Sequence, residues 1–287
     1  MRKSLAAFCK KVIAEMYFSN GNRMVPVLMY HALEESEYTS GAADPGEQLY
    51  VLSANTFHVQ MQYLAEYGFR VMSLAGLVNL SQWPEKTVVL TFDDGHASNY
   101  HLAYPILKQF AFQATFFITT GWVGRRFFLA SKEIKYLAES GMEIGSHGVT
   151  HEFFSDMSKK QIREELSESH QFLCQCTGKQ ISSFSAPGGR ISSHIVRIGA
   201  ELGYSVFCTS RFAPFKANTS IQSVPRMAVK ANTDLQTFQK MVHLDAAFLK
   251  SQQIKNGILY LLKKGLGNTL YERFRDRIFS WKCHGQA

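Results

Sequence analysis

The chain has 287 residues, of which 46% are hydrophobic and 19% are charged, and its formal net charge at pH 7 is +8. This composition is typical of a globular protein with a large core, and it excludes a disordered chain, a collagen-like chain and a small disulfide-stapled scaffold. The apolar stretches near the C-terminus are far shorter than the ~20 residues that span a bilayer, so we expect no membrane-spanning helix.

Positive charge is concentrated at the two ends of the chain. Residues 1–24 carry a net charge of +4 and residues 250–287 carry +6, which leaves −2 for the body between them. A nucleic-acid groove needs a basic face on the folded domain itself, so we exclude nucleic acid as a partner. Basic ends on a near-neutral body fit either peripheral contact with an anionic membrane surface or simple solubility.

The cysteines and the N-terminal stretch both favour a cytoplasmic location. The chain has five cysteines, an odd number without a C-x-x-C pair, which is more typical of reduced thiols than of a disulfide framework. Lys10 and Lys11 interrupt the short apolar patch at the start, so we expect no secretory signal peptide. We therefore predict that the protein is cytoplasmic, either free or peripheral at the inner face of the membrane. The sequence does not indicate an oligomeric state.

Short β-branched or aromatic runs alternate with segments of helical periodicity, which is typical of βα units around a parallel sheet. In chain order, the predicted strands are 25–30, 69–74, 87–92, 114–119, 142–145, 183–185, 205–209 and 223–229. The predicted helices are 56–67, 99–110, 132–140, 159–177 and 194–202, and the sequence is helical from residue 233 onward. Residues 36–53 are polar and glycine-rich, which predicts a loop long enough to be functional.

The C-terminal end has the pattern of a basic amphipathic helix. Leu270, Phe274 and Ile278 recur at i, i+4 and i+8, so they share one helix face. Such a helix packs on the domain or lies on a membrane surface.

Two adjacent carboxylates follow the strongest predicted strand. Thr91-Phe92 leads directly into Asp93-Asp94-Gly95, and the carboxyl ends of parallel strands are where barrel active sites gather. Adjacent carboxylates repel unless a cation or hydrogen-bond donors hold them, so the pair suggests a metal. In an extended segment the two side chains point oppositely, so one would bind the metal while the other faces the substrate water. The alternative is an Asx turn, which is common for Asp-Gly.

Two histidines follow another short strand. His147 and His151 are spaced i, i+4, which places them on one face of a helix or tight turn and suits a shared transition ion. With Asp94 they offer two nitrogens and one oxygen, and catalytic zinc sites use three protein ligands plus water. We therefore predict a divalent metal site on Asp94, His147 and His151, with Zn²⁺ as the default ion and Co²⁺, Mn²⁺ or Ni²⁺ also suited.

Three motifs together resemble a known family. The Thr91–Gly95 run, the His147-x-x-x-His151 pair and Pro187-Gly188-Gly189 look like the first three motifs of the polysaccharide deacetylases, carbohydrate esterase family 4 with the NodB homology domain. The resemblance covers residues 25–230 and implies an α/β fold, a distorted (β/α)7 barrel. In this plan a basic segment, 1–24, precedes the barrel and a basic helical C-terminal extension, 231–287, follows it.

The resemblance also implies a reaction. It implies metal-dependent removal of N-acetyl groups from an amino-sugar-containing polysaccharide, oligosaccharide or lipid-linked saccharide. Asp93 would be the general base toward a metal-bound water, and Asp94, His147 and His151 would hold the metal.

The sequence departs from the family pattern at the third motif. Ser185 occupies the place of the arginine that normally orients the catalytic base. Arg190 and Arg226 are nearby candidates to supply the missing guanidinium, and nothing in the sequence chooses between them.

In the family pattern the general-acid histidine follows a strand near the end of the domain, but no strand followed by a histidine is found after residue 210. His243 lies in a helical stretch and is predicted to be structural. The strand-His form of the family's last motif instead appears at residues 27–31. This order resembles the circularly permuted deacetylases of exopolysaccharide systems, and the first and last strands of a closed barrel are neighbours. The resemblance therefore implies that His31 is the general acid; the alternative is a histidine that merely ends a buried strand.

Several residues are predicted substrate contacts, and two other functions stay open. Trp122 follows the strand 114–119 and could stack on a sugar ring; the other candidates are Pro187, Gly188, Arg190 and Arg226. One alternative is a deformylase or amide hydrolase acting on a polyprenyl-linked amino sugar or a non-sugar substrate. The other is a catalytically weak barrel that binds saccharide, which Ser185 at the arginine position would favour.

Overall fold

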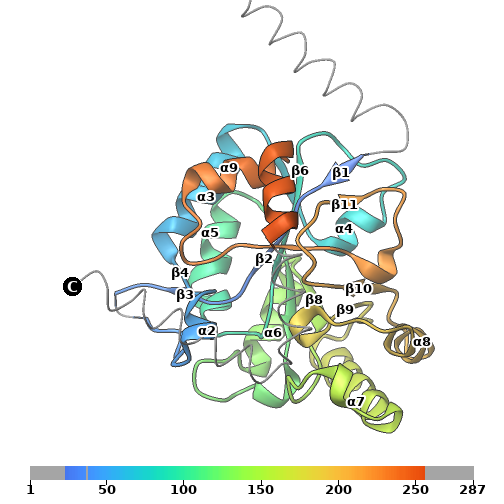
Figure 1. Ribbon diagram of the computed structural model, residues 1–287. Coiled ribbons are helices and arrows are strands. Elements are labelled where there is room, and N and C mark those ends of the chain that lie inside the picture. Colours follow the sequence, from blue (N-terminus) through green and yellow to red (C-terminus); the bar gives the residue numbers. More distant parts are fainter. Residues whose placement is uncertain (1–22, 37, 256–287) are drawn as a thin grey trace, which may run out of the picture.

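The computed structural model describes residues 23–36 and 38–255, and its centre is a curled sheet of parallel strands surrounded by helices (Figure 1). The strand order is β10-β9-β8-β7-β6-β2-β12, and β5 also pairs with β6. The strands are β2 (Val27–Tyr30), β5 (Arg70–Met72), β6 (Thr87–Phe92), β7 (Thr115–Ile118), β8 (Glu143–Ser146), β9 (Ser183–Ser185), β10 (Val206–Cys208) and β12 (Met227–Ala228). This architecture confirms the predicted α/β class and barrel-type sheet.

Helices connect successive strands and cover the outside of the sheet. They are α2 (Pro45–Gln48), α3 (Ala54–Glu66), α4 (Leu74–Val78), α5 (Tyr104–Gln109), α6 (Ser131–Glu139), α7 (Lys159–Thr177), α8 (Ser193–Glu201) and α9 (Leu235–Val242). A π-helical turn, Asn99–Ala103, leads into α5, and 3₁₀ turns lie at Thr120–Trp122, Phe154–Asp156, Pro187–Gly189 and Ile221–Ser223. Helices α3, α5 and α9 lie together on one side, whereas α7 and α8 lie side by side on another (Figure 1).

Two small strand pairs lie outside the central sheet. Strand β1 (Met24–Val25) pairs antiparallel with β11 (Phe215–Lys216). Strand β3 (Leu33–Glu34) pairs parallel with β4 (Leu52–Ser53), so the segment after β2 is folded back against the start of α3.

The first and last strands of the sheet are neighbours. Strand β2 pairs with β6 on one edge and with β12 on the other. Just before β12, Val224 forms a parallel bridge with Cys208 of β10. The segment 224–228 therefore links the two ends of the strand order, as expected for a sheet that curls toward closure. Because the strands are parallel, the residues that follow β2, β6, β8 and β9 gather at one end.

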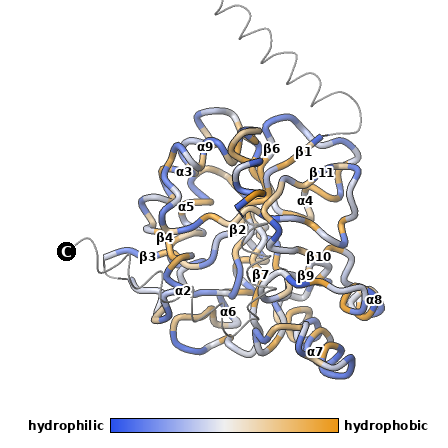
Figure 2. The backbone as a smooth tube through the Cα atoms, viewed as in Figure 1, coloured by the Kyte–Doolittle hydropathy of each residue, from blue (hydrophilic) through white to orange (hydrophobic). Residues whose placement is uncertain are grey.

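The core explains why β6 reads as an unbroken apolar run. All six residues of β6 are buried, since strands flank both of its edges and helices cover the sheet. Phe92, its last residue, is stacked against Tyr30 at 5.3 Å and Phe116 at 4.9 Å between ring centroids. The peripheral helices carry both hydrophobic and hydrophilic residues, as α7 shows in Figure 2, because only one face of each packs inward.

Helix boundaries follow local capping chemistry. Helix α7 begins with a capping box, in which the Ser158 hydroxyl accepts from the Gln161 N–H and the Gln161 side chain accepts from the Ser158 N–H. It ends at Gly178, whose φ of 69° is left-handed. These signals are why the predicted bounds of this helix, 159–177, match the structure.

Several predicted boundaries are wrong for identifiable reasons. The run 25–30 is divided at Pro26, which has no N–H to donate to a sheet, into β1 and β2. The run 223–229 shortens to a 3₁₀ turn followed by the two-residue β12. The predicted loop 36–53 contains α2 and β4.

Packing continues past residue 230, where the predicted barrel ends. Phe238 and Met241 of α9 are buried in the same core cluster as the strand residues. Within residues 23–36 and 38–255, no helix is long and apolar enough to cross a membrane. The basic segment 1–22 and the predicted amphipathic helix around Phe274 lie outside the described residues.

Truncation of Phe92 should be among the most destabilising changes in this core. Phe92→Ala removes a fully buried ring that packs against three other aromatic rings, so we expect a loss of about 3–5 kcal/mol in the free energy of unfolding. Chemical denaturation measures this loss. Val59→Ala on α3, where the side chain is exposed, is the matched control and should stay within about 0.5 kcal/mol.

Candidate active site

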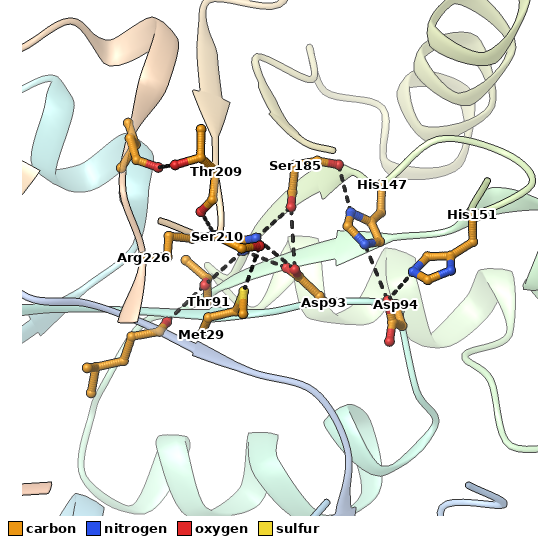
Figure 3. Close-up of polar contacts among 12 residues, drawn as sticks. Met29, Thr91, Asp93, Asp94, His147, His151, Ser185, Thr209, Ser210 and Arg226 are labelled. Carbon is orange, nitrogen blue, oxygen red and sulfur yellow. Dashed lines mark hydrogen bonds and ion pairs between the residues drawn. The ribbon is translucent and has the colours of Figure 1, made fainter. Parts of the chain in front are cut away.

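Two adjacent carboxylates point to different partners at the end of β6. The Asp93 N–H still donates to the Tyr30 carbonyl at 2.9 Å, in continuation of the strand pairing. Asp94 then adopts a left-handed φ of 75°, followed by Gly95 at 80°. Figure 3 shows the result: Asp93 faces Arg226 and Ser185, whereas Asp94 faces His147 and His151. The sequence predicted this divergence from an extended backbone; the left-handed turn is its actual cause.

Asp94, His147 and His151 form a compact set of potential metal ligands. Asp94 Oδ1 lies 3.3 Å from His147 Nε2 and 3.1 Å from His151 Nε2, and the three ligand atoms are all within 4.8 Å of one another. Neighbouring ligands of one ion have such separations when each lies about 2.0–2.2 Å from the metal. Burial raises the pKa of Asp94, but the surrounding imidazoles outweigh burial and hold this pKa well below its usual value.

The tautomer of His147 supports the same interpretation. Its Nδ1 donates to the Ser185 carbonyl at 2.7 Å, so a neutral ring presents the bare lone pair of Nε2 to Asp94. Asp94 Oδ1 is buried and has no hydrogen-bond partner among the described residues. Two acceptor atoms that face each other in a buried site need a cation between them. The donor set therefore fits a divalent ion, and a carbonyl that fixes a ligating imidazole is common around such ions.

The segment between the two histidines is a loop and not a helix. The buried carboxylate of Glu165, on α7, fixes this loop from one side. Glu165 Oε2 accepts from the Val149 N–H at 2.6 Å and from the Thr150 N–H at 3.1 Å. Gly148 has a left-handed φ of 82°, and a Cβ there would lie 2.9 Å from Glu165 Oε2. Glycine therefore lets the loop approach this carboxylate closely.

The opposite side of the same loop is held by the turn after β7. The N–H groups of Thr120 and Gly121 donate to the Gly148 and Val149 carbonyls, each at 3.0 Å. A Cβ on Gly121 would lie 2.4 Å from the Val149 carbonyl oxygen, so this contact requires glycine. The loop is thus clamped on both sides, with His151 at its end in a left-handed conformation of φ 66°.

Asp93 is held by a buried arginine. Arg226 is fully buried, and its two terminal nitrogens donate to Asp93 Oδ1 at 2.6 Å and Oδ2 at 2.8 Å. The same guanidinium donates to the Ser185 hydroxyl at 2.8 Å and, through Nε, to the Thr209 carbonyl at 3.1 Å. Burial raises the pKa of Asp93, but the positive charge of Arg226 outweighs it, so the net shift is downward.

The structure thereby chooses between the two candidate arginines. Arg226 meets Asp93 beside Ser185, whereas the Arg190 guanidinium lies over the Phe153 ring at 4.5 Å and donates to Ser155 at 3.2 Å. Arg226 was also a predicted substrate contact, and its complete burial behind Asp93 corrects that prediction.

His31 follows β2, directly beside the end of β6. Its ring lies 4.5 Å from the Tyr50 ring, and its carbonyl accepts from the Asn99 side-chain amide at 2.8 Å. Its Nδ1 is buried without a hydrogen-bond partner in the described part of the chain. Burial lowers the pKa of His31, against the opposing influence of the nearby Asp94 and Asp93 carboxylates. His243, predicted to be structural, bonds instead to the Tyr63 hydroxyl at 2.9 Å.

The other predicted contact residues have different surroundings. The Trp122 ring lies 4.8 Å from the His151 ring, so the structure brings it to the ligand cluster. Pro187 is buried. Gly188 has a left-handed φ of 65°, and a Cβ added there would lie 2.6 Å from the Phe153 ring. Sequence reasoning missed Glu165, because nothing in a helical run marks one glutamate as the acceptor of loop N–H groups.

Comparison with known proteins gives a consistent picture. Residues 81–207 match the family profile described as polysaccharide deacetylase. YxkH of Bacillus subtilis, whose name assigns it to the polysaccharide deacetylases, is 25% identical over 209 residues, which cover 71% of each chain. The poly-beta-1,6-N-acetyl-D-glucosamine N-deacetylase of Staphylococcus aureus is 26% identical over 180 residues, 55% of this chain and 61% of that protein.

A solved structure is similar over most of the chain. The Streptococcus pyogenes deacetylase PplD, in complex with acetate, superposes with a TM-score of 0.67 at 27% identity. The match covers 77% of this chain and 98% of that one.

Breaking the buried ion pair should cost far more stability than breaking a surface pair. Arg226→Met leaves Asp93 buried without its cation, so we expect a loss of about 3–5 kcal/mol in the free energy of unfolding. Arg163→Met removes an exposed arginine that pairs with Glu201 and should cost less than about 1 kcal/mol. Urea denaturation at pH 7 compares the two variants, and equal losses would contradict a special role for the buried pair.

The same comparison has a defined pH dependence. Because the pKa of Asp93 is lowered in the fold, its stabilising contribution is fully present above the ordinary carboxyl pKa of about 3.9 and is lost as the pH falls through the lowered value. In Arg226→Met burial raises the pKa of Asp93 without this opposing charge, so the stability gap between wild type and the variant should shrink steadily as the pH falls from 7 to 3. A gap that stays constant from pH 7 to pH 3 would contradict this linkage.

Removal of the loop anchor should loosen the histidine pair. Glu165→Ala removes the carboxylate that accepts from the Val149 and Thr150 N–H groups, and we expect a cost of about 1–3 kcal/mol. We expect lower stability and weaker Zn²⁺ affinity, measured by denaturation and by competition with a chelating dye. The control is Glu164→Ala, one position along α7, where the side chain is exposed and pairs with Lys160; it should leave both quantities unchanged.

Proposed function

We propose that this chain, whose residues 81–207 match the polysaccharide deacetylase family profile, is a metal-dependent hydrolase that removes N-acetyl groups from a saccharide containing N-acetylglucosamine. The observation that carries the proposal is the separation of two carboxylate environments at one end of the sheet. Asp94 joins two histidines in a metal-ligand set, and Asp93, the preceding residue, is ionised against Arg226. The named activity of the Staphylococcus aureus relative supports the choice of sugar.

In this proposal Asp94, His147 and His151 hold a divalent ion, Zn²⁺ by default. Such an ion lowers the pKa of a bound water toward neutrality and polarises a carbonyl oxygen. The side chains supply a negative charge and two neutral imidazoles, which is the donor chemistry of catalytic zinc sites with three protein ligands.

Asp93 is the proposed general base. A base must be ionised before it can accept the proton of the attacking water, and the bidentate contact with Arg226 favours the ionised form. Ser185 adds a hydroxyl to the same guanidinium, so serine and Arg226 together take the place of the motif arginine. The oriented Asp93–Arg226 pair favours an active enzyme over a barrel that only binds saccharide.

His31 is the proposed general acid. It lies at the end of β2, the strand paired directly with β6, and its ring packs against Tyr50. When the tetrahedral carbon collapses, the departing amine needs a proton, which a protonated imidazole donates. A lowered pKa makes this imidazolium a stronger acid. Trp122 is the proposed wall of the sugar site, because its ring lies beside His151.

Release of acetate tests the proposal. The full chain, stripped of metal and then reloaded with Zn²⁺ or Co²⁺, is assayed on chitooligosaccharides, poly-N-acetylglucosamine and a lipid-linked N-acetylhexosamine. We expect release only after reloading. Asp93→Asn should lower kcat by about 10²–10⁴-fold without loss of bound metal, and Asp156→Asn, an exposed aspartate outside the cluster, should not change it.

Three other outcomes of this assay would contradict parts of the proposal. Full activity of Asp93→Asn would refute its role as base. Formate release from a formylated lipid-linked sugar, with no acetate from any substrate, would replace the deacetylase by a deformylase. Stoichiometric metal without any product would leave a saccharide-binding barrel.

A further inference from the structure

The second oxygen of the Asp94 carboxylate has a partner of its own. While Oδ1 faces His147 and His151, Oδ2 lies 3.5 Å from His96 Nε2. Both the Asp94 and the His96 side chains are 13% exposed, so solvent competes little for this contact. His96 is separated from Asp94 only by Gly95, whose left-handed φ of 80° turns the chain so that residue 96 returns toward residue 94.

The His96 ring lies at the start of a short series of aromatic rings in contact with one another. It stacks on Phe128 at a centroid distance of 5.1 Å and an interplanar angle of 24°. Phe128 lies 4.7 Å from Trp122, which in turn lies 4.8 Å from His151. The series therefore begins at the group facing Asp94 Oδ2 and ends on a proposed metal ligand.

The backbone around His96 is fixed as firmly as its ring. His96 and Phe128 form an antiparallel bridge. On either side of it, the Ala97 N–H donates to the Phe127 carbonyl at 2.8 Å and the Leu129 N–H donates to the Gly95 carbonyl at 2.9 Å. These contacts fix the Cα position of His96, and the stacking on Phe128 restrains the rotation of its ring.

The position of the imidazole proton follows from burial. His96 Nδ1 is buried and has no hydrogen-bond partner in residues 23–36 and 38–255. A proton on Nδ1 would be a buried donor without an acceptor, which is unfavourable. A proton on Nε2 instead points at Asp94 Oδ2. The favoured neutral tautomer therefore donates to the carboxylate.

We propose that His96 is a positioning residue for the metal site: its Nε2–H holds Asp94 Oδ2, so that the carboxylate presents Oδ1 alone to the ion. An unheld carboxylate rotates and can offer either oxygen or both. A fixed one keeps a single ligand atom beside the two histidine nitrogens, as outer hydrogen bonds do for many ligating carboxylates. This inference rests on the proposed metal-dependent function, but it concerns metal affinity rather than the substrate.

The test compares two substitutions, each of which keeps one feature of the histidine side chain. His96→Phe keeps an aromatic ring against Phe128 and removes the donor, whereas His96→Gln keeps an N–H donor on a side chain of similar length. His101→Phe is the control, because His101 lies on the same segment but pairs with Glu133 outside the cluster. Zn²⁺ affinity is measured by chelator competition, the Co²⁺ absorption spectrum reports ligand geometry, and thermal melting of the metal-free protein reports folding.

We expect His96→Phe to weaken Zn²⁺ binding by about 10–100-fold and to change the Co²⁺ spectrum, with an unchanged melting temperature of the metal-free protein. His96→Gln should recover most of the affinity, and His101→Phe should match wild type. Wild-type affinity in His96→Phe would overturn the proposal. So would an equal loss in both His96 variants, since the donor would then be irrelevant. Because wild-type acetate release is scored separately, a failure of the deacetylase assignment is distinguishable from a failure here.

Discussion

The buried ion pair between Asp93 and Arg226 is the contact on which the rest of this site depends. It joins the end of β6 to the segment that enters β12, so it connects the centre of the sheet with its last strand. Two charges without access to water are tolerated only when their geometry and remaining hydrogen bonds are satisfied. Ser185 and the Thr209 carbonyl provide those remaining contacts for the guanidinium. The same arrangement that keeps the sheet end together keeps a carboxylate ionised beside the proposed reaction centre.

A single left-handed residue gives two adjacent carboxylates different chemistry. Asp93 completes the strand pairing and turns toward a fixed positive charge of the protein. Asp94, at φ 75°, turns toward two imidazoles, with which it forms a set that fits an added cation. Aspartate tolerates this conformation better than most residues, and such strain persists only where the surroundings determine it. Here the clamped loop that carries His147 and His151 provides those surroundings.

Much of the fold and the grouping of Asp94, His147 and His151 could be predicted from the sequence, because they depend on local patterns. Strand β6 and helix α7 were predicted to the residue, since an apolar run and a capping box mark them unambiguously. The choice of Arg226 over Arg190 could not be predicted, because it depends on a contact with Asp93 across 133 positions of the chain. The role of Glu165 was not predicted for the same reason, because it accepts hydrogen bonds from loop N–H groups that only the tertiary fold brings near.

The position of β2 within the sheet has a consequence for folding kinetics. Its partners are β6 and β12, and the latter pairing joins Leu28 to Met227. Closing so long a stretch of chain is entropically costly, and contacts of large sequence separation slow folding. Until β12 arrives, β2 exposes an unpaired apolar edge, which is the kind of surface that associates with other chains. The strand that precedes His31 is therefore fully paired only after a segment about 200 residues later in the chain has been made and has reached it.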